Sequence, residues 1–201
     1  MKLYYAPGAC SLSPHIVAEE AGIPLELEKV DLKTHKTEKG DDFYNINPKG
    51  YVPALKLDDG AVLTEGPAIV QYLADQKPES HLAPENGTFA RYRLQEWLTF
   101  INSELHKNFG PLFGAASDEV KNDAKAKIAK RLTYVNEQLA GKSYLLGSEF
   151  TVADAYLFVM LTWANHLKLD MTPFSNLHVY FAKIVARPKV HAAMKAEGLV
   201  K

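Results

Sequence analysis

With 201 residues, 47% of them hydrophobic and 23% charged, and a formal net charge of −1, the chain has the composition of an ordinary globular protein. The near-zero charge, without a basic stripe, argues against nucleic acid or an anionic membrane as a partner. The single cysteine excludes an internal disulfide, and no run approaches the roughly 20 apolar residues of a membrane span. We therefore expect a cytoplasmic protein.

The first eighty residues alternate short β-prone runs with helical pieces. Residues 2–5 predict a strand, and Pro14, in a first helical turn where its missing N–H costs little, predicts a helix that ends near Gly22. Residues 25–30 alternate apolar and polar side chains with period two, which predicts a half-exposed strand. The polar and charged residues 31–40 predict a loop.

The rest of this half continues the same pattern. Residues 41–47 predict a short helical turn, and residues 52–57 and 61–64, joined by an Asp-Asp-Gly turn, predict a hairpin. Pro67 then opens a helix with apolar side chains at helical spacing. The order β-α-β followed by β-β-α indicates a small sheet with helices packed on it.

The only cysteine lies where the first strand hands over to the first helix. Free N–H groups and the positive end of a helix dipole favour a thiolate over a thiol at Cys10. The alternative is a small apolar residue in the core, which is the common role of a lone cysteine in a cytosolic chain. The position at a strand–turn–helix junction favours a functional thiol.

The second half shows no strand signal. Composition changes at residues 78–87, which we interpret as a linker, and helix faces follow at residues 94–105 and 128–139. The spacing of Thr151 and Asp154 predicts a capping box before a helix that is apolar nearly all round, and therefore buried. The predicted domains are 1–80, with a thioredoxin-like α/β fold, and 87–201, all helical.

This order of elements resembles the cytosolic glutathione transferases, and local motifs are similar to those of the bacterial beta class. The motifs are Tyr5, Pro7-Gly8-Ala9-Cys10-Ser11, Asn47-Pro48-Lys49-Gly50, Val52-Pro53-Ala54-Leu55, Leu63-Thr64-Glu65-Gly66, Leu105-His106-Lys107, Thr151-Val152-Ala153-Asp154-Ala155-Tyr156 and Ala196-Glu197-Gly198-Leu199. The similarity covers essentially the whole chain in order, and this co-occurrence is far more specific than any one motif.

The resemblance implies glutathione as cosubstrate and assigns its binding residues. A cis peptide before Pro53 would turn the backbone of Val52 toward the cysteinyl part of glutathione. Glu65 would receive the γ-glutamyl ammonium, and the N–H of Gly66, at a helix start, its carboxylate. Many relatives carry serine in place of Gly66, whose hydroxyl would add a bond.

Further contacts are implied by the same family. His35 stands where a basic side chain, often lysine, usually meets the glycyl carboxylate, and a histidine is only partly charged near neutrality. The family also places a set from the second half around glutathione, some reaching across to a partner subunit: Thr99, Ser103, Glu104, Leu105 and His106. Thr99 departs from the asparagine often found there.

The implied reaction is attack of the glutathione sulfur on an electrophilic carbon of a small hydrophobic molecule, as in detoxification. Candidates for stabilising the thiolate are Tyr5, the helix start at Cys10 and Ser11, and His106. In the beta class the cysteine can also form a mixed disulfide with glutathione, which implies thiol-disulfide exchange. The expected electrophile pocket is lined by Lys107, Phe109, Phe113 and Trp163.

Each of these residues could instead have a purely structural role. Glu65 could serve only the helix dipole, and His35 and Lys107 could be solvated side chains. His106 could be a hydrogen-bonded structural residue, and the aromatic residues could belong to the core. The histidines show no ligand-like spacing with the single cysteine, so we expect no metal.

Three other functions fit the same fold. One is a glutathione-dependent thioltransferase or peroxidase that uses Cys10, and another is a dehalogenating transferase, distinguishable only by its substrate. The third is a non-catalytic stress or ligand-binding protein. The joint presence of Cys10, Val52-Pro53, Glu65 and His106 argues against the third, since packing needs no such set. The family also implies a homodimer.

Overall fold

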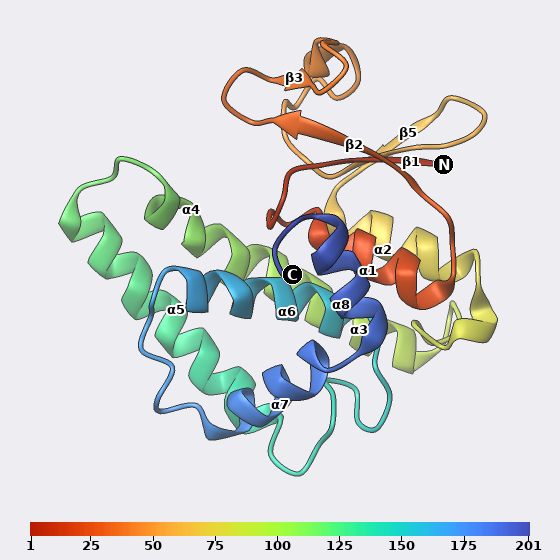
Figure 1. Ribbon diagram of the computed structural model, residues 1–201. Coiled ribbons are helices and arrows are strands. Elements are labelled where there is room, and N and C mark those ends of the chain that lie inside the picture. The colour runs from red at the N-terminus through yellow and green to blue at the C-terminus, as the bar shows by residue number, and fades with distance from the viewer. The chain divides into compact units, whose positions relative to one another are not determined.

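The computed structural model describes every residue from Met1 to Lys201 (Figure 1). Two units can be separated by their internal contacts, residues 1–83 together with 186–201, and residues 84–185. The first holds a mixed sheet with helices and the second is helical, which confirms the predicted fold class. None of the helices combines the length and the apolar character that crossing a membrane requires.

The sheet of the first unit has the strand order β3-β2-β1-β4-β5. Its strands are β1 (Lys2–Tyr5), β2 (Glu26–Asp31), β3 (Lys36–Thr37), β4 (Ala54–Lys56) and β5 (Val62–Thr64). β1 pairs parallel with β2 and antiparallel with β4, while the β2–β3 and β4–β5 pairs are antiparallel. The predicted hairpin is therefore present. The parallel pair needs a crossover, which the first helix supplies.

One predicted loop is wrong in part, because residues 36 and 37 form the edge strand β3. Thr37 pairs with Val30, and Lys36 with Asp31. A two-residue strand has no apolar alternation that a sequence pattern could detect. The short turn predicted at 41–47 is a 3-10 helix, η1 (Phe43–Asn45), whose Asp42 carboxylate accepts a hydrogen bond from the N–H of Tyr44.

Helices α1 (Leu12–Ala21) and α2 (Gly66–Asp75) pack on each other and lie on the same side of the sheet (Figure 1). α1 ends at Gly22, whose left-handed conformation, φ 66°, suits a residue without Cβ. A 3-10 turn, η2 (Pro78–Ser80), follows α2. The peptide between Val52 and Pro53 is cis, as the family resemblance implies.

The second unit begins with one long helical run. α3 (Phe89–Phe100) continues into a π-helical turn, η3 (Ile101–His106), and then into α4 (Lys107–Phe113). After it come α5 (Asp118–Gln138), α6 (Val152–His166) and α7 (Ser175–Val185). π-helical turns are uncommon in proteins as a whole, but those that occur are often found at functional sites.

α6 runs through the middle of this unit, and nearly all of its residues are buried, as its apolar sequence predicts. The predicted capping box is present. The Asp154 carboxylate accepts hydrogen bonds from the N–H and the hydroxyl of Thr151, at 2.8 and 2.9 Å. Further hydrogen bonds come from the N–H of Leu145 and the hydroxyl of Tyr180. The buried carboxylate thus ties three segments together.

The last helix, α8 (Pro188–Ala196), groups by its contacts with the first unit rather than with the helical half in which the sequence places it. Its buried Val190 and Ala193 are part of the reason, because α8 packs against α1. Arg187, just before the helix, also pairs with Glu20 at 2.7 Å. An apolar face shows that a helix packs, but not against which neighbour.

Candidate active site

Cys10 and Val52 come from separate segments of the first unit and meet in the structure. The Cys10 thiol donates to the carbonyl of Val52 at 3.3 Å, beside the cis peptide before Pro53. α1 begins two residues later, and the N–H and hydroxyl of Ser13 bind the Cys10 carbonyl at 3.1 and 2.8 Å. The lone cysteine is therefore partly exposed beside a helix start, not a buried apolar filler.

Ser11 lies next to the cysteine but turns inward. Its side chain is fully buried, accepts from the N–H of Ala6 at 3.1 Å and donates to the carbonyl of Ala6 at 3.2 Å. Both bonds fix the loop between β1 and α1. The side chain of Ser11, a catalytic candidate at the helix start, is thus engaged with the backbone.

Glu65 precedes α2 and lies in an unusual backbone conformation, with φ 70°. Its carboxylate accepts hydrogen bonds from the ammonium of Lys49 and from the hydroxyl of Tyr51, the latter at 3.1 Å. The bond to Glu65 raises the pKa of Lys49. Sequence reasoning did not assign Lys49 and Tyr51 to the site. Their place in the motif before Val52-Pro53 was the available signal.

Gly66 is the first residue of α2, where backbone N–H groups have no partner within the helix. A Cβ added here would meet only Cγ of Pro53, at 4.0 Å, an ordinary contact. The serine of many relatives would therefore fit without rearrangement.

His35 lies in a left-handed conformation, φ 52°, in the segment between β2 and β3. Its Nδ1 lies 2.9 Å from the carbonyl of Gly50, and since a carbonyl only accepts, Nδ1 carries a proton. The ring also lies 4.7 Å from the ring of Tyr44, centroid to centroid. His35 is thus a fixed, half-buried ring rather than a solvated side chain.

Tyr5 ends β1, half-buried, with its ring 6.5 Å from that of His15. Burial, reinforced by the negative charge of Glu197, raises the pKa of Tyr5, so its hydroxyl keeps its proton at neutral pH. Glu197 is itself buried. It lies 2.9 Å from Nδ1 of His15 and accepts from the N–H of Gly8 at 2.9 Å. The C-terminal segment therefore fixes the loop that carries Cys10.

In the second unit, His106 sits at the end of the π-helical turn among aromatic rings. Its Nδ1 lies 2.5 Å from the hydroxyl of Tyr156, which donates to Oδ1 of Asn102 at 3.0 Å. Burial, with a smaller contribution from Lys107, lowers the pKa of His106 to about 4. The ring is therefore neutral near pH 7.

The structure brings together the aromatic residues expected to line the electrophile pocket. The ring of Trp163 packs edge-on against those of His106, Phe109 and Phe113, with centroids 4.9, 5.6 and 5.1 Å away. Phe109 is fully buried, whereas Phe113 is 52% exposed and Lys107 is exposed. Part of this cluster therefore belongs to the hydrophobic core, as the alternative interpretation of these aromatic residues predicts, and part of it faces solvent.

The other expected residues of this unit lie on the same helical run. Thr99 and Ser103 are exposed, and the Ser103 hydroxyl donates to the carbonyl of Thr99 at 2.9 Å. Glu104 pairs with the Arg131 guanidinium through two hydrogen bonds, at 2.8 and 3.2 Å. Leu105 is fully buried, so its side chain serves the core.

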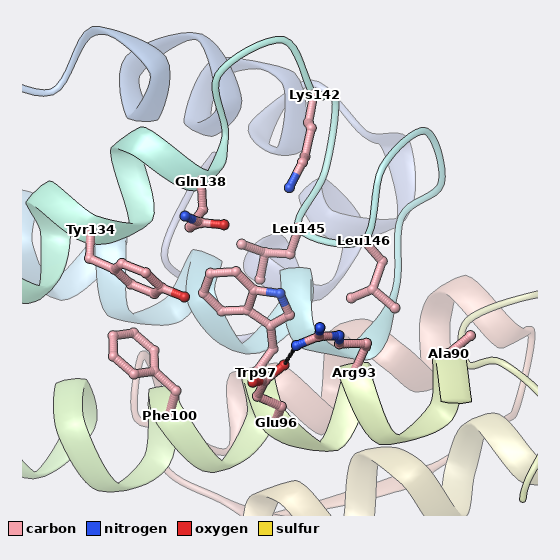
Figure 2. Close-up of a pocket in the computed structure, with 10 residues that line it drawn as sticks. All are labelled: Ala90, Arg93, Glu96, Trp97, Phe100, Tyr134, Gln138, Lys142, Leu145 and Leu146. Atoms are coloured by element: carbon pink, nitrogen blue, oxygen red, sulfur yellow. Dashed lines mark hydrogen bonds and ion pairs between the residues drawn. The ribbon is translucent and has the colours of Figure 1, made fainter. Parts of the chain in front are cut away.

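A groove of about 670 Å³ lies between α3, α5 and the segment after α5 (Figure 2). Trp97, Phe100 and Tyr134 form its aromatic wall, with centroids 5.3–5.9 Å apart. Trp97 lies within the apolar helix face predicted at residues 94–105, but its ring is only half-buried and lines this groove. No group of three or more His, Cys, Asp or Glu side chains is arranged to hold a metal ion.

Comparison with known proteins agrees with this architecture. Residues 8–76 match the N-terminal domain model of glutathione S-transferases, and residues 95–188 match the C-terminal domain model. The chain is 46% identical to glutathione S-transferase GstA of Escherichia coli O157:H7 over 200 residues, 99% of this chain and 100% of the relative. The chain therefore belongs to the glutathione S-transferase family.

Solved structures narrow the class. A bacterial beta-class glutathione S-transferase from Sphingomonas chungbukensis has a TM-score of 0.97 at 53% identity, covering 100% of both chains. A sphingomonad glutathione S-transferase complexed with glutathione has a TM-score of 0.96 at 51% identity, also covering 100% of both chains. The expected membership of the bacterial beta class is confirmed.

Proposed function

We propose that this glutathione S-transferase binds glutathione around Cys10, Val52 and Glu65 and joins its thiolate to a small hydrophobic electrophile. The observation that carries the proposal is the contact between the Cys10 thiol and the Val52 carbonyl. It places a partly exposed sulfur against a main-chain segment that can pair with a peptide. Binding would then set the glutathione sulfur near Cys10 in a fixed orientation.

The charges of the first unit match the ends of glutathione. Glu65 already accepts hydrogen bonds from an ammonium and a hydroxyl, so it can accept them from the γ-glutamyl ammonium. The N–H of Gly66, at the helix start, suits the adjacent carboxylate. His35, held by Gly50, is the proposed contact of the glycyl carboxylate.

The glutathione thiolate needs hydrogen-bond donors and positive potential. We assign these to the start of α1 beside Cys10 and to the hydroxyl of Tyr5, which keeps its proton. The Ser11 hydroxyl bonds with Ala6 and has only the supporting role of fixing the loop. In the second unit we propose Thr99, Ser103, Glu104, the backbone of Leu105 and His106 as further glutathione contacts, and Lys107, Phe109, Phe113 and Trp163 as the electrophile pocket.

Glutathione conjugation to chlorodinitrobenzene, compared in the wild type and Cys10→Ala, tests the assignment. Loss of activity with glutathione still bound would place Cys10 at the chemistry. Retained activity would assign thiolate stabilisation to Tyr5 or the backbone and leave a redox role for Cys10. If neither protein conjugated, conjugation would be excluded for this electrophile.

Thiol-disulfide exchange is the second candidate function, favoured by the partial exposure of Cys10. The Cys10 thiolate would attack one sulfur of glutathione disulfide, forming a mixed disulfide and releasing one glutathione thiolate. Mass spectrometry after treatment with glutathione disulfide should show one added glutathione, absent in Cys10→Ser. An unmodified wild-type chain would contradict exchange.

We further propose a homodimer in the cytoplasm. The groove on α3 and α5 has a partly exposed aromatic wall, a feature that often marks interaction surfaces, and the exposed Thr99 and Ser103 lie on the same helical run as α3. The single cysteine suits a reducing compartment. Light scattering should give the mass of two chains. A clean monomer would contradict any partner contribution to the site.

A further inference from the structure

Asn102, His106 and Tyr156 form a chain of hydrogen bonds within the second unit. The first two lie on the π-helical turn η3, and Tyr156 comes from the buried helix α6. The Tyr156 hydroxyl is 2.5 Å from Nδ1 of His106 and 3.0 Å from Oδ1 of Asn102, and the Tyr156 side chain is 2% exposed. Burial holds the tyrosine in one position.

The position of each proton follows from the donors available. A tyrosine hydroxyl has one proton, and here it is donated to the amide oxygen of Asn102, which can only accept. The bond between Tyr156 and His106 must then use a proton on Nδ1 of the imidazole. Since the ring is neutral near pH 7, Nε2 carries the lone pair.

We propose that Tyr156, oriented by Asn102, is a positioning residue that holds His106 as the neutral Nδ1–H tautomer, so that Nε2 accepts a hydrogen bond from an S–H or N–H group of glutathione. This rests on the proposed role of His106 as a glutathione contact. The π-helical turn η3 supports the proposal, because both Asn102 and His106 lie on this turn.

The tautomer decides what His106 can do to the sulfur. A thiolate needs a donor, and Nε2 in this tautomer is an acceptor, so His106 orients a proton-bearing group instead of stabilising the anion. Nor does His106 remove the thiol proton. An ordinary thiol has a pKa of about 8.5, more than four units above that of His106, so the proton stays on sulfur in that contact. Ionisation therefore depends on the donors of the first unit.

Nitrogen-15 NMR of histidine-labelled protein tests the tautomer directly. The His106 signal is assigned by its loss in His106→Asn, since the chain has seven histidines. The wild type should show the Nδ1–H pattern at pH 7. Tyr156→Phe keeps the ring packing but removes the acceptor for Nδ1–H, so His106 should change to the Nε2–H tautomer. An Nε2–H wild type, or an unchanged tautomer in Tyr156→Phe, would overturn the proposal.

Two comparisons separate positioning from mere stability. Asn102→Asp keeps an accepting oxygen and should retain the wild-type tautomer, whereas Asn102→Leu should lose it. Tyr180→Phe removes another buried hydroxyl of the same unit, which donates to Asp154, and should lower stability without changing the tautomer. A tautomer change in Tyr180→Phe would indicate a general packing effect and contradict the specific role of Tyr156.

Kinetics give the functional consequence. Tyr156→Phe should lower kcat/KM for glutathione about tenfold, the effect of losing one oriented hydrogen bond. Asn102→Asp should stay close to the wild type. An unaltered kcat/KM after a demonstrated tautomer change would overturn the role in glutathione binding. Absence of glutathione binding in every variant, including the wild type, would instead contradict the proposed function while the NMR result stood.

Discussion

The candidate residues of the first unit include main-chain groups and partly exposed charges, whereas the second unit adds a neutral histidine and a cluster of aromatic rings to its exposed polar side chains. The Lys49 and Glu65 side chains are 44% and 47% exposed, while Tyr156 and Phe109 are almost or fully buried. Water lets the first set keep its charges, and burial makes charge costly in the second. This difference agrees with the proposed binding of the glutathione ammonium and thiolate in the first unit and of an apolar electrophile in the second.

The largest expected effect comes from the buried Glu197, which fixes the Cys10 loop from the C-terminal segment. Glu197→Ala leaves His15 and the N–H of Gly8 without their carboxylate partner. The free energy of unfolding should fall by about 3–5 kcal/mol, as for other broken buried pairs. Urea unfolding measures this, with the 72%-exposed Glu79 side chain as a control in Glu79→Ala. Equal, small losses in both variants would show that the loop does not depend on Glu197.

The second prediction concerns the pH dependence of stability that follows from the buried, neutral ring of His106. Its pKa of about 4 in the folded protein lies below the unfolded value of 6.5, so the unfolded chain binds more protons between these pH values. Stability from His106 is thus fully present above pH 6.5 and is lost as the pH falls through 4, by about 3 kcal/mol in total. His106→Asn should lack this part of the pH slope. Identical slopes would contradict a buried, neutral ring.

Removing a charge from the first unit tests its assignment to the ammonium of glutathione. Glu65→Ala should raise KM for glutathione by about 10–100-fold, the range for a hydrogen bond to a charged group. A glutathione analogue without the γ-glutamyl amine provides the matched control. The wild type should bind this analogue about as weakly as Glu65→Ala binds glutathione itself. If the mutation weakened the analogue by the same factor, Glu65 would act elsewhere than on the ammonium.

The smallest expected change is a gain. Gly66→Ser adds a hydroxyl at the start of α2, where its Cβ fits 4.0 Å from Pro53. One further hydrogen bond, worth about 0.5–1.5 kcal/mol, should lower KM for glutathione by about 2–10-fold. Gly66→Ala has the same Cβ without the hydroxyl and should leave KM near the wild-type value. An equal decrease in both variants would assign the gain to helix propensity instead.

The sequence predicted local structure better than it predicted contacts between residues distant in the chain. Residues close in the chain were predicted well: the start of α1 beside Cys10, the hairpin of β4 and β5, and the capping box of Thr151 and Asp154. The two-residue strand β3 was missed, because its partner and not its own pattern makes it a strand. Trp97 shows the same limit, since helical periodicity marks an apolar face but not where neighbouring helices leave a groove.

The sequence by itself determined the order of elements, the fold class and the motifs that identify the family, because turn chemistry, helix capping and apolar periodicity act within a few residues. Only the tertiary structure decided what the polar side chains do. In the folded protein the Ser11 side chain points inward, and Lys49 and Tyr51 donate hydrogen bonds to Glu65. Tyr156 and Asn102 lie beside His106. Proton positions and charge depend on burial and on partners distant in the chain, and no spacing along the sequence specifies these.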